Sequence, residues 1–283
     1  MANNLNTRKA KQKTLTALKF VVLFIYLVVV MFPFFWMLST SFKPSNEING
    51  PVDYIPNAPT IENYFNMLVK GNFAKYMLNS LIASTFAAAV ATFCGILAGY
   101  VISRFNFRMK TPVYLFFMIT QMIPSFIMLA PLYSMLSKAG MTNSLWTLAL
   151  LYANMTIPFS VVTMSGFYAG VSNSIEEAAW IDGCGYVRAL FSVIVPLLLP
   201  GIAATAIFAF MNSWNELFMA VMFVDMDKFK TITVGLNSLI LKYNIKWGEM
   251  AAGTVLALVP TMVLFAFAQK YMIEGLTAGS VKG

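Results

Sequence analysis

The sequence predicts an all-helical integral membrane protein with six spans, and three observations support this prediction. Of the 283 residues, 59% are hydrophobic and only 11% are charged, against about a quarter charged in a soluble domain. Six stretches lack charge for long enough to cross a bilayer, which takes ~20 apolar residues. Nothing alternates as barrel strands do, and backbone at membrane depth must be bonded internally, so the spans are expected to be helices.

The six spans are expected in uncharged segments that together form one domain over 1–283. The first follows Lys19, and its apolar run is too long for the core of a signal peptide. The second contains Gly95 and Gly99, a spacing that favours close packing within the subunit or against another one. The expected ranges are 20–39, 77–102, 112–136, 145–168, 194–222 and 250–270.

The loops differ in charge, and this difference predicts the orientation of the chain. Basic residues concentrate in TRKAKQKTLTALK at the N-terminus and in RFNFRMK after the second span. The positive-inside rule therefore places 1–19, the loop 170–192 and the tail 271–283 in the cytoplasm, in a prokaryotic cell (inner) membrane. A proline-rich loop at 40–75 and a second loop at 225–249 lie outside. The second either contacts a partner outside the membrane or only covers the spans.

The acidic stretch SIEEAAWIDG, within the cytoplasmic loop, predicts a short helix of about two turns. Ser174 and Glu177 have the spacing of a capping box, and acidic residues suit a helix N-terminus. Gly183 favours a left-handed helix end. Ala178 and Ala179 would allow another surface to approach closely. The alternative is an ordinary loop kept in water by its acids.

The longer stretch EEAAWIDGCGYVRALFSVIVPLLLP resembles the EAA loop of permease subunits of ATP-binding-cassette importers. The pattern is Glu-Ala-Ala, a Gly four residues beyond, and an ending of the form aliphatic-x-aliphatic-Pro. Here Val193, Val195 and Pro196 form this ending, and the two valines are conservative departures from the Ile and Leu that the family often has. FMNSWNELFMAVMF and QKYMIEGLTAGSVKG are similar to segments of maltose-type carbohydrate permeases. The resemblance covers nearly the whole chain. It implies the type I ABC importer permease fold, with a cytoplasmic coupling helix in the loop between spans four and five.

The resemblance also implies partners and roles for residues. The partners are a second permease subunit in a heterodimer, two copies of a cytoplasmic ABC ATPase and an extracytoplasmic sugar-binding protein, with membrane lipid around them. No cofactor is expected on this chain. ATP and Mg would bind the ATPase subunits, because G-x-x-x-x-G-K-[ST] is absent from the sequence. Docking residues for the ATPase are Glu177, Ala178, Ala179, Asp182 and Gly183, and the tail at the ATPase interface includes Gly275, Gly279, Lys282 and Gly283.

Polar or helix-breaking residues inside the predicted spans mark a candidate path for a carbohydrate, with an oligosaccharide expected. Unsatisfied polar groups are costly in hydrocarbon, while amides and carboxylates can hydrogen-bond sugar hydroxyls. Bridging between helices is the alternative explanation for each of them. The candidate path or gate residues are Gln121, Asn154, Asn212, Trp214, Asn215 and Glu216, with Pro124, Ser125, Thr156, Pro158 and Ser213 beside them.

The composition excludes several other classes of protein. The chain has no histidine, and neither Cys94 nor Cys184 lies in a pattern typical of a disulfide framework or zinc site. We therefore expect no enzyme and no metal site. Its basic residues lie in loops beside apolar spans, so nucleic-acid binding is not expected. An ion-coupled secondary transporter is the alternative function, but it would want buried acids at mid-membrane, where Glu216 alone is a candidate.

Overall fold

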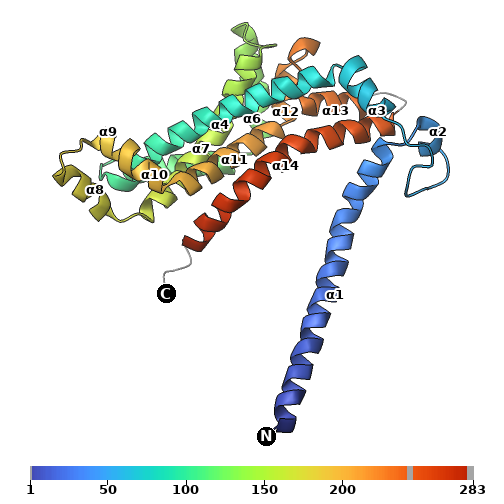
Figure 1. Ribbon diagram of the computed structural model, residues 1–283. Helices are drawn as coiled ribbons and strands as arrows, with labels where there is room; N and C mark the ends of the chain where they lie inside the picture. Colours follow the sequence, from blue (N-terminus) through green and yellow to red (C-terminus); the bar gives the residue numbers. More distant parts are fainter. Residues whose placement is uncertain (1, 241–244, 279–283) are drawn as a thin grey trace. The chain divides into compact units, whose positions relative to one another are not determined.

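The computed structural model describes residues 2–240 and 245–278, with the backbone alone for 2–11, 268 and 270–278. All regular structure in these residues is helical, which confirms the predicted fold class (Figure 1). Contacts divide the chain into two compact units, and each is described by itself. The first comprises Met1–Gly71 with Tyr243–Leu256, and the second Asn72–Lys242 with Ala257–Gly283.

Helices long and apolar enough to cross a membrane lie in the same parts of the chain as the predicted spans. Four helices in the described residues meet this condition, and two bent helix pairs raise the number to as many as six. The four lie in α1 (Ala2–Ser41), α4 (Phe73–Arg104), α7 (Leu145–Ala169) and α14 (Trp247–Ala278).

In the first unit, the proline-rich loop folds back on the end of α1. Asn63, in α3 (Glu62–Phe65), donates to the carbonyl oxygens of Ser41 at 2.9 Å and of Lys43 at 2.8 Å. The Ser41 hydroxyl also lies 2.7 Å from the hydroxyl of Tyr64. The loop is therefore held by hydrogen bonds within its own unit. The loop also contains the short helices α2 (Ser45–Ile48) and η1 (Asn66–Lys70).

In the second unit, α4 packs along α7 and α11 (Leu199–Trp214), and small residues let the helices approach closely (Figure 1). A Cβ added to Gly95 would lie 2.8 Å from the Ser160 carbonyl oxygen. One added to Gly99 would lie 2.9 Å from Met164 Cβ. Of the two packing partners that the glycine spacing allows, the structure places a helix of the same chain against these residues.

The predicted span 112–136 is not one continuous helix, because α5 (Lys110–Met122) and α6 (Ser125–Lys138) meet at 96°. Between them Ile123 is extended, with ψ 119°, and Pro124 follows. A residue before proline avoids the helical conformation, and proline has no N–H to donate. The break therefore lies at a residue pair where a continuous helix is disfavoured.

The predicted span 194–222 is also broken. The chain passes through η2 (Leu190–Ile194) and α10 (Val195–Leu197), then bends by 82° into α11. Pro200 lies in the first turn of α11, where its missing N–H is tolerated but its ring stops the preceding helix from continuing. Non-helical residues at 215–217 separate α11 from α12 (Phe218–Phe223).

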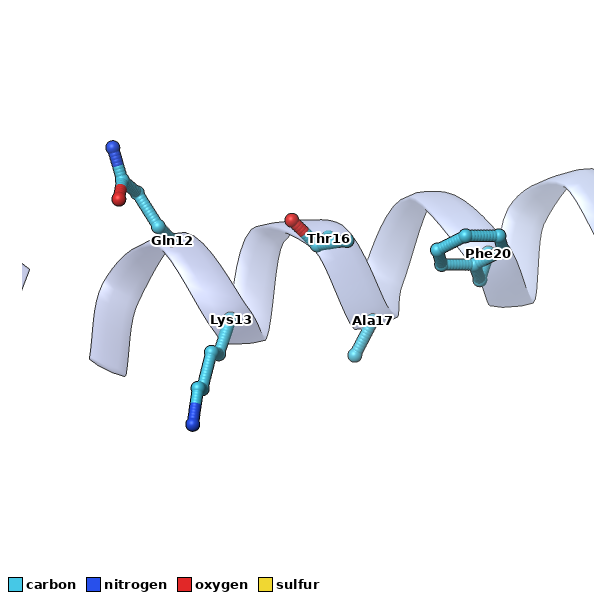
Figure 2. Close-up of a pocket in the computed structure, with 5 residues that line it drawn as sticks. All are labelled: Gln12, Lys13, Thr16, Ala17 and Phe20. Atoms are coloured by element: carbon cyan, nitrogen blue, oxygen red, sulfur yellow. The ribbon is translucent and has the colours of Figure 1, made fainter. Parts of the chain in front are cut away.

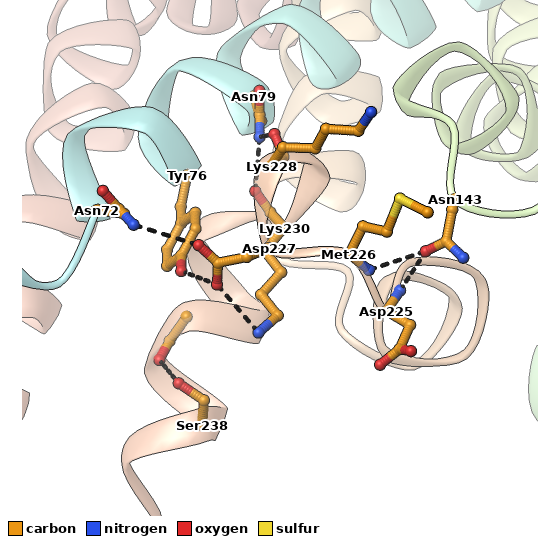
Figure 3. A network of polar contacts seen from close by, with 11 residues as sticks. Asn72, Tyr76, Asn79, Asn143, Asp225, Met226, Asp227, Lys228, Lys230 and Ser238 are labelled. Carbon is orange, nitrogen blue, oxygen red and sulfur yellow. Dashed lines mark hydrogen bonds and ion pairs between the residues drawn. The ribbon is translucent and has the colours of Figure 1, made fainter.

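Polar contacts hold loop 225–231 against the start of α4 (Figure 3). Asp227, in η3 (Asp227–Phe229), accepts from the Tyr76 hydroxyl at 2.5 Å. Asn79 donates to two carbonyl groups of the loop, at 3.0 and 2.9 Å. The Asn143 side-chain oxygen accepts from two loop amides, at 2.7 and 2.9 Å. The loop is thus fixed at both ends before α13 (Ile232–Ile240) begins.

Candidate functional site

The acidic loop 170–192 contains α8 (Asn173–Ile181), a helix of nine residues. Ser172 precedes it in an extended conformation, and its hydroxyl oxygen accepts from the N–H of Ser174 at 3.4 Å. The predicted capping box between Ser174 and Glu177 is therefore wrong, since Ser174 already lies inside the helix. Two serines precede the glutamates, and spacing alone did not identify which one ends the extended segment.

The other end of α8 closes at Gly183, as predicted, where φ is +86°. The Gly183 N–H donates to the Trp180 carbonyl oxygen at 3.0 Å, and the Cys184 N–H to that of Ala179 at 2.9 Å. These two bonds form a Schellman ending. Apart from Gly183 itself and its two neighbours in the chain, no atom of the described residues lies within 4 Å of a Cβ added there, so the positive φ and not a lack of space favours glycine. The chain continues into α9 (Tyr186–Ala189).

One face of α8 is buried and the other is exposed. Glu176 and Ala179 are buried, whereas Glu177, Ala178 and Asp182 are exposed. Residues three or four apart share a helix face, so this division follows the helical period. The predicted docking residues therefore separate. Glu177, Ala178 and Asp182 lie where another molecule can reach them, while Ala179 packs inside this chain.

Glu176 connects α8 to the end of α4. Its Oε1 lies 2.5 Å from Arg104 Nε, and the two side chains are 2% and 9% exposed. The Tyr100 hydroxyl donates to its other carboxylate oxygen at 3.1 Å. Arg104 Nη2 also donates to the Val171 carbonyl oxygen at 2.9 Å. Neither Arg104 nor Tyr100 is among the site residues predicted from the sequence. The available signal was the helical period, which puts Glu176 on the same face as Ala179.

Aromatic rings extend this connection. The Trp180 ring lies 4.8 Å from that of Tyr186, which is 6.0 Å from Phe105. Tyr100 is 5.8 Å from Phe105 and 5.5 Å from Tyr168 of α7. Such pairs each contribute about 0.5–1.5 kcal/mol beyond their burial. Rings from α9, α4 and α7 therefore stabilise the position of α8.

Four of the predicted path residues lie at the surface of the second unit. Gln121, Asn154 and Asn215 are exposed, and Asn212 is half-buried. Asn212 and Asn215 donate to carbonyl oxygens one turn earlier in α11, at 3.0 and 2.9 Å. Amides exposed at membrane depth are costly in lipid, so this surface is suited to water or to another protein.

Trp214 and Glu216 make structural contacts within the chain. Trp214 is 2% exposed, and its indole N–H donates to the Ala257 carbonyl oxygen in α14 at 3.2 Å. The Glu216 carboxylate accepts from the amides of Met219 at 2.9 Å and Ala220 at 3.2 Å, at the start of α12. In this structure Trp214 joins α11 to α14 and Glu216 caps the start of α12, in contrast to the four amide residues at the surface.

Two further features define no site. A hollow on α1 is lined by residues of that helix alone, which Figure 2 labels: Gln12, Lys13, Thr16, Ala17 and Phe20. Two turns of one helix do not enclose a ligand. In the predicted tail at the ATPase interface, Gly275 lies in α14, where the backbone alone is described. Gly279, Lys282 and Gly283 lie outside the described residues.

The chain is similar in sequence to membrane components of bacterial transport systems. The family model described as binding-protein-dependent transport system inner membrane component matches residues 91–277. The chain is 35% identical to the diacetylchitobiose uptake system permease protein DasC of Streptomyces coelicolor, over 93% of this chain and 95% of that one. It is 29% identical to the maltodextrin transport system permease protein MalD of Streptococcus pneumoniae, over 98% and 99% of the two chains.

The fold matches a solved structure of a bacterial ABC transporter involved in the import of the acidic polysaccharide alginate. The TM-score is 0.81 at 17% sequence identity, and the match covers 92% of this chain and 97% of that one. At this low sequence identity the match shows the fold alone. The structural similarity confirms the fold predicted for the chain. Together with the family match over most of its length, this means that the chain belongs to the inner membrane components of binding-protein-dependent transport systems.

Proposed function

We propose that this chain is the membrane-spanning permease subunit of an ATP-binding-cassette importer for a carbohydrate, with an oligosaccharide as the expected cargo. The relatives by name carry diacetylchitobiose or maltodextrin, and the trehalose/maltose permease MalG of Thermococcus litoralis is 29% identical over 90% of this chain. These sugars differ from one another, so the relatives' names support a carbohydrate as the class of cargo but do not identify which carbohydrate this chain carries.

The observation that carries the proposal is the exposed face of α8. Glu177 and Asp182 offer carboxylates to basic groups of an ATPase, and Ala178 between them allows close approach. Ser172 caps one end and Gly183 closes the other. A helix closed at both ends and packed on aromatic rings moves as a body when it is pushed. Through η2 and α10 this displacement reaches α11.

The complete importer contains two copies of a separate ATPase, which bind ATP and Mg, and a second permease. The need for a second permease is supported by the exposed amides Gln121, Asn154, Asn212 and Asn215. In a single chain these groups would face lipid, whereas a second permease would enclose them in a polar path. An extracytoplasmic sugar-binding protein delivers the cargo. Both termini and α8 lie in the cytoplasm, which the basic N-terminus supports.

The alternative, an ion-coupled secondary transporter, has less support. It requires an acid free to exchange an ion at membrane depth. Glu216 was the candidate, but its two carboxylate oxygens accept from the Met219 and Ala220 amides. Because both oxygens are already hydrogen-bonded to the backbone, this carboxylate is not free to exchange an ion, as a secondary transporter would require.

The test is uptake by the reconstituted complex. The chain is tagged, purified with the subunits that bind it, and placed in liposomes with the binding protein outside. Titration of the binding protein with maltose, trehalose and diacetylchitobiose identifies the cargo to use. We expect uptake to require Mg·ATP at the ATPase face and to continue when ionophores collapse all ion gradients. Gradient-driven uptake by this chain alone would contradict the proposal.

A further inference from the structure

Two adjacent glutamates in α8 have opposite surroundings. Glu177 is exposed, as expected of a group that meets another protein, whereas Glu176 is 1% exposed. A buried carboxylate is destabilising unless it is paired and hydrogen-bonded. A residue whose only purpose was to keep the loop in water would not be placed there. The position of Glu176 therefore needs its own explanation.

The groups around Glu176 come from α4. Arg104, the last residue of that helix, contacts one carboxylate oxygen at 2.5 Å, and the Tyr100 hydroxyl contacts the other at 3.1 Å. The same guanidinium donates to the Val171 carbonyl oxygen at 2.9 Å, just before α8 begins. Because guanidinium is a rigid planar fork, these contacts fix the direction of α8 as well as its position.

Chain connectivity does not join α8 to α4. The residues 170–172 link α8 to α7, and Asp182–Gly185 link it to α9, but α4 continues into 105–109 and then α5. Side chains alone connect α8 to α4, and among them the Arg104–Glu176 pair carries the charge. At its other end α4 holds loop 225–231 through Tyr76 and Asn79. A displacement of α4 would therefore also move that loop.

We propose that Glu176 is a positioning residue, which locks α8 to α4 through Arg104 so that both helices move together when an ATPase displaces α8. Glu177 then meets the ATPase, and Glu176 transmits its movement within this chain. The inference rests on the proposed function for the source of the movement. The ion pair itself does not depend on that function.

The experiment measures whether α4 follows α8. Spin labels are placed at two exposed positions, Ser174 in α8 and Val101 in α4, in the whole complex with Cys94 and Cys184 replaced by Ser. The distance between the labels is measured without nucleotide and after trapping with Mg·ATP and vanadate. In the labelled protein with the Arg104–Glu176 ion pair intact, we expect the same distance between the labels in both states. In Glu176→Gln we expect the distance to shift on trapping, because α8 follows the ATPase and α4 does not.

Glu177→Gln is the matched control, because the same chemical change is made on the exposed face. We expect less ATPase to be retained on purification, and in the complexes that do retain it we expect the label distance to stay constant on trapping. An unchanged distance in Glu176→Gln on trapping, or a change with the ion pair intact, overturns the proposal.

Further variants cover failure to assemble and failure of the proposed function. If Glu176→Gln does not assemble, Arg104→Gln with Glu176→Gln removes the unpaired buried cation and is measured in its place. The double variant should show the same shift, and a constant distance in it overturns the proposal. If the unmodified chain retains no ATPase, the proposed function fails. The ion pair is then tested without nucleotide, where Glu176→Gln should still broaden the distribution of distances and an unchanged distribution would refute the lock.

Discussion

Gly183 and Gly185 stand on either side of Cys184 and differ in backbone conformation. Gly183 has φ +86°, whereas Gly185 is extended, with φ −73° and ψ 161°. For both, no atom of the described residues lies within 4 Å of an added Cβ. Space is therefore equal at the two positions, and only the backbone angle distinguishes them.

Gly183→Ala should destabilise the end of α8 by about 1 kcal/mol, because a left-handed conformation is unfavourable for a residue with a Cβ. Gly185→Ala is the control and should have almost no effect, since any residue adopts an extended conformation. Hydrogen exchange of the α8 backbone amides in the whole protein, and the amount of ATPase that stays bound when the tagged chain is purified, measure the difference. Gly183→Asp should release or uncouple the ATPase while membrane insertion stays intact. Equal behaviour of the two alanine variants would remove the role given to the helix end.

Asp227 belongs to the polar network of loop 225–231 (Figure 3). The hydrogen bond from Tyr76 lowers the pKa of its carboxyl, partial burial opposes this, and Lys230 and Asn72 add to the lowering. The pKa in the folded protein thus lies below the unfolded value of ~3.9. The contacts stabilise the fold above that pH, and this stabilisation is lost as pH falls through the folded pKa.

Asp227→Asn should therefore lower the melting temperature of the detergent-solubilised protein at neutral pH. The difference from the unmodified chain should shrink below about pH 4, where the carboxylate becomes protonated. Asp225→Asn is the control, because Asp225 contributes its main-chain N–H to the network. A difference that stays constant with pH would show that the Asp227 charge does not stabilise the loop.

At the scale of helices, the pair α4 and α7 depends on glycine where the two backbones meet. The Cβ of an alanine at Gly95 would lie 2.8 Å from the Ser160 carbonyl oxygen, which is closer than carbon and oxygen approach each other. At Gly166, on α7, no atom of the described residues outside the surrounding helix backbone lies within 4 Å of the added Cβ. One substitution therefore tests packing and the other tests helix propensity alone.

Gly95→Ala should destabilise the protein by about 1–3 kcal/mol, as other overpacked positions do. Gly166→Ala should be neutral or stabilising by up to about 1 kcal/mol, because alanine favours the helix. Thermal unfolding in detergent measures both. Equal stability of the two variants would mean that the helices separate easily and that α4 does not rely on this contact.

Proline shows how far the sequence can predict these elements. Composition located every apolar stretch, but Pro33, Pro131, Pro158 and Pro260 lie inside continuous helices. Pro124 and Pro200 instead stand at breaks. A proline by itself therefore does not determine whether a helix continues or breaks, so the sequence did not predict the two breaks.

The candidate site shows the same division between local and distant contacts. The Gly183 ending was predictable because its hydrogen bonds lie within six residues of chain. The Arg104–Glu176 pair joins residues 72 apart, so no local pattern indicates it. Ser172 is an intermediate case, since a serine at the helix start was predictable, but the reciprocal capping box was wrong and the capping serine lies two residues earlier.

At the scale of the whole molecule, exposed amide side chains on apolar helices indicate where this chain would need a partner. Gln121, Asn154 and Asn212 come from three helices of the second unit, and each is exposed or half-buried. Lipid against these amides is unfavourable, so in the assembled importer they should face water along the path of the cargo. Phe116, on the same helix as Gln121, is 64% exposed and apolar, as suits contact with lipid or protein.

Cysteines placed at Gln121, Asn154 and Asn212, with Cys94 and Cys184 replaced by Ser, should react with a charged, membrane-impermeant methanethiosulfonate reagent in the assembled complex. Phe116→Cys is the matched control and should not react, because a charged reagent does not enter hydrocarbon. If an ATPase displaces α8 as proposed, vanadate trapping should change the rates at the amide positions, because the displacement would reach α11, which carries Asn212. If all three positions resist the reagent in both states, these amides join helices and the cargo passes elsewhere. Equal labelling of Phe116→Cys would mean that polarity does not distinguish the path from its surroundings.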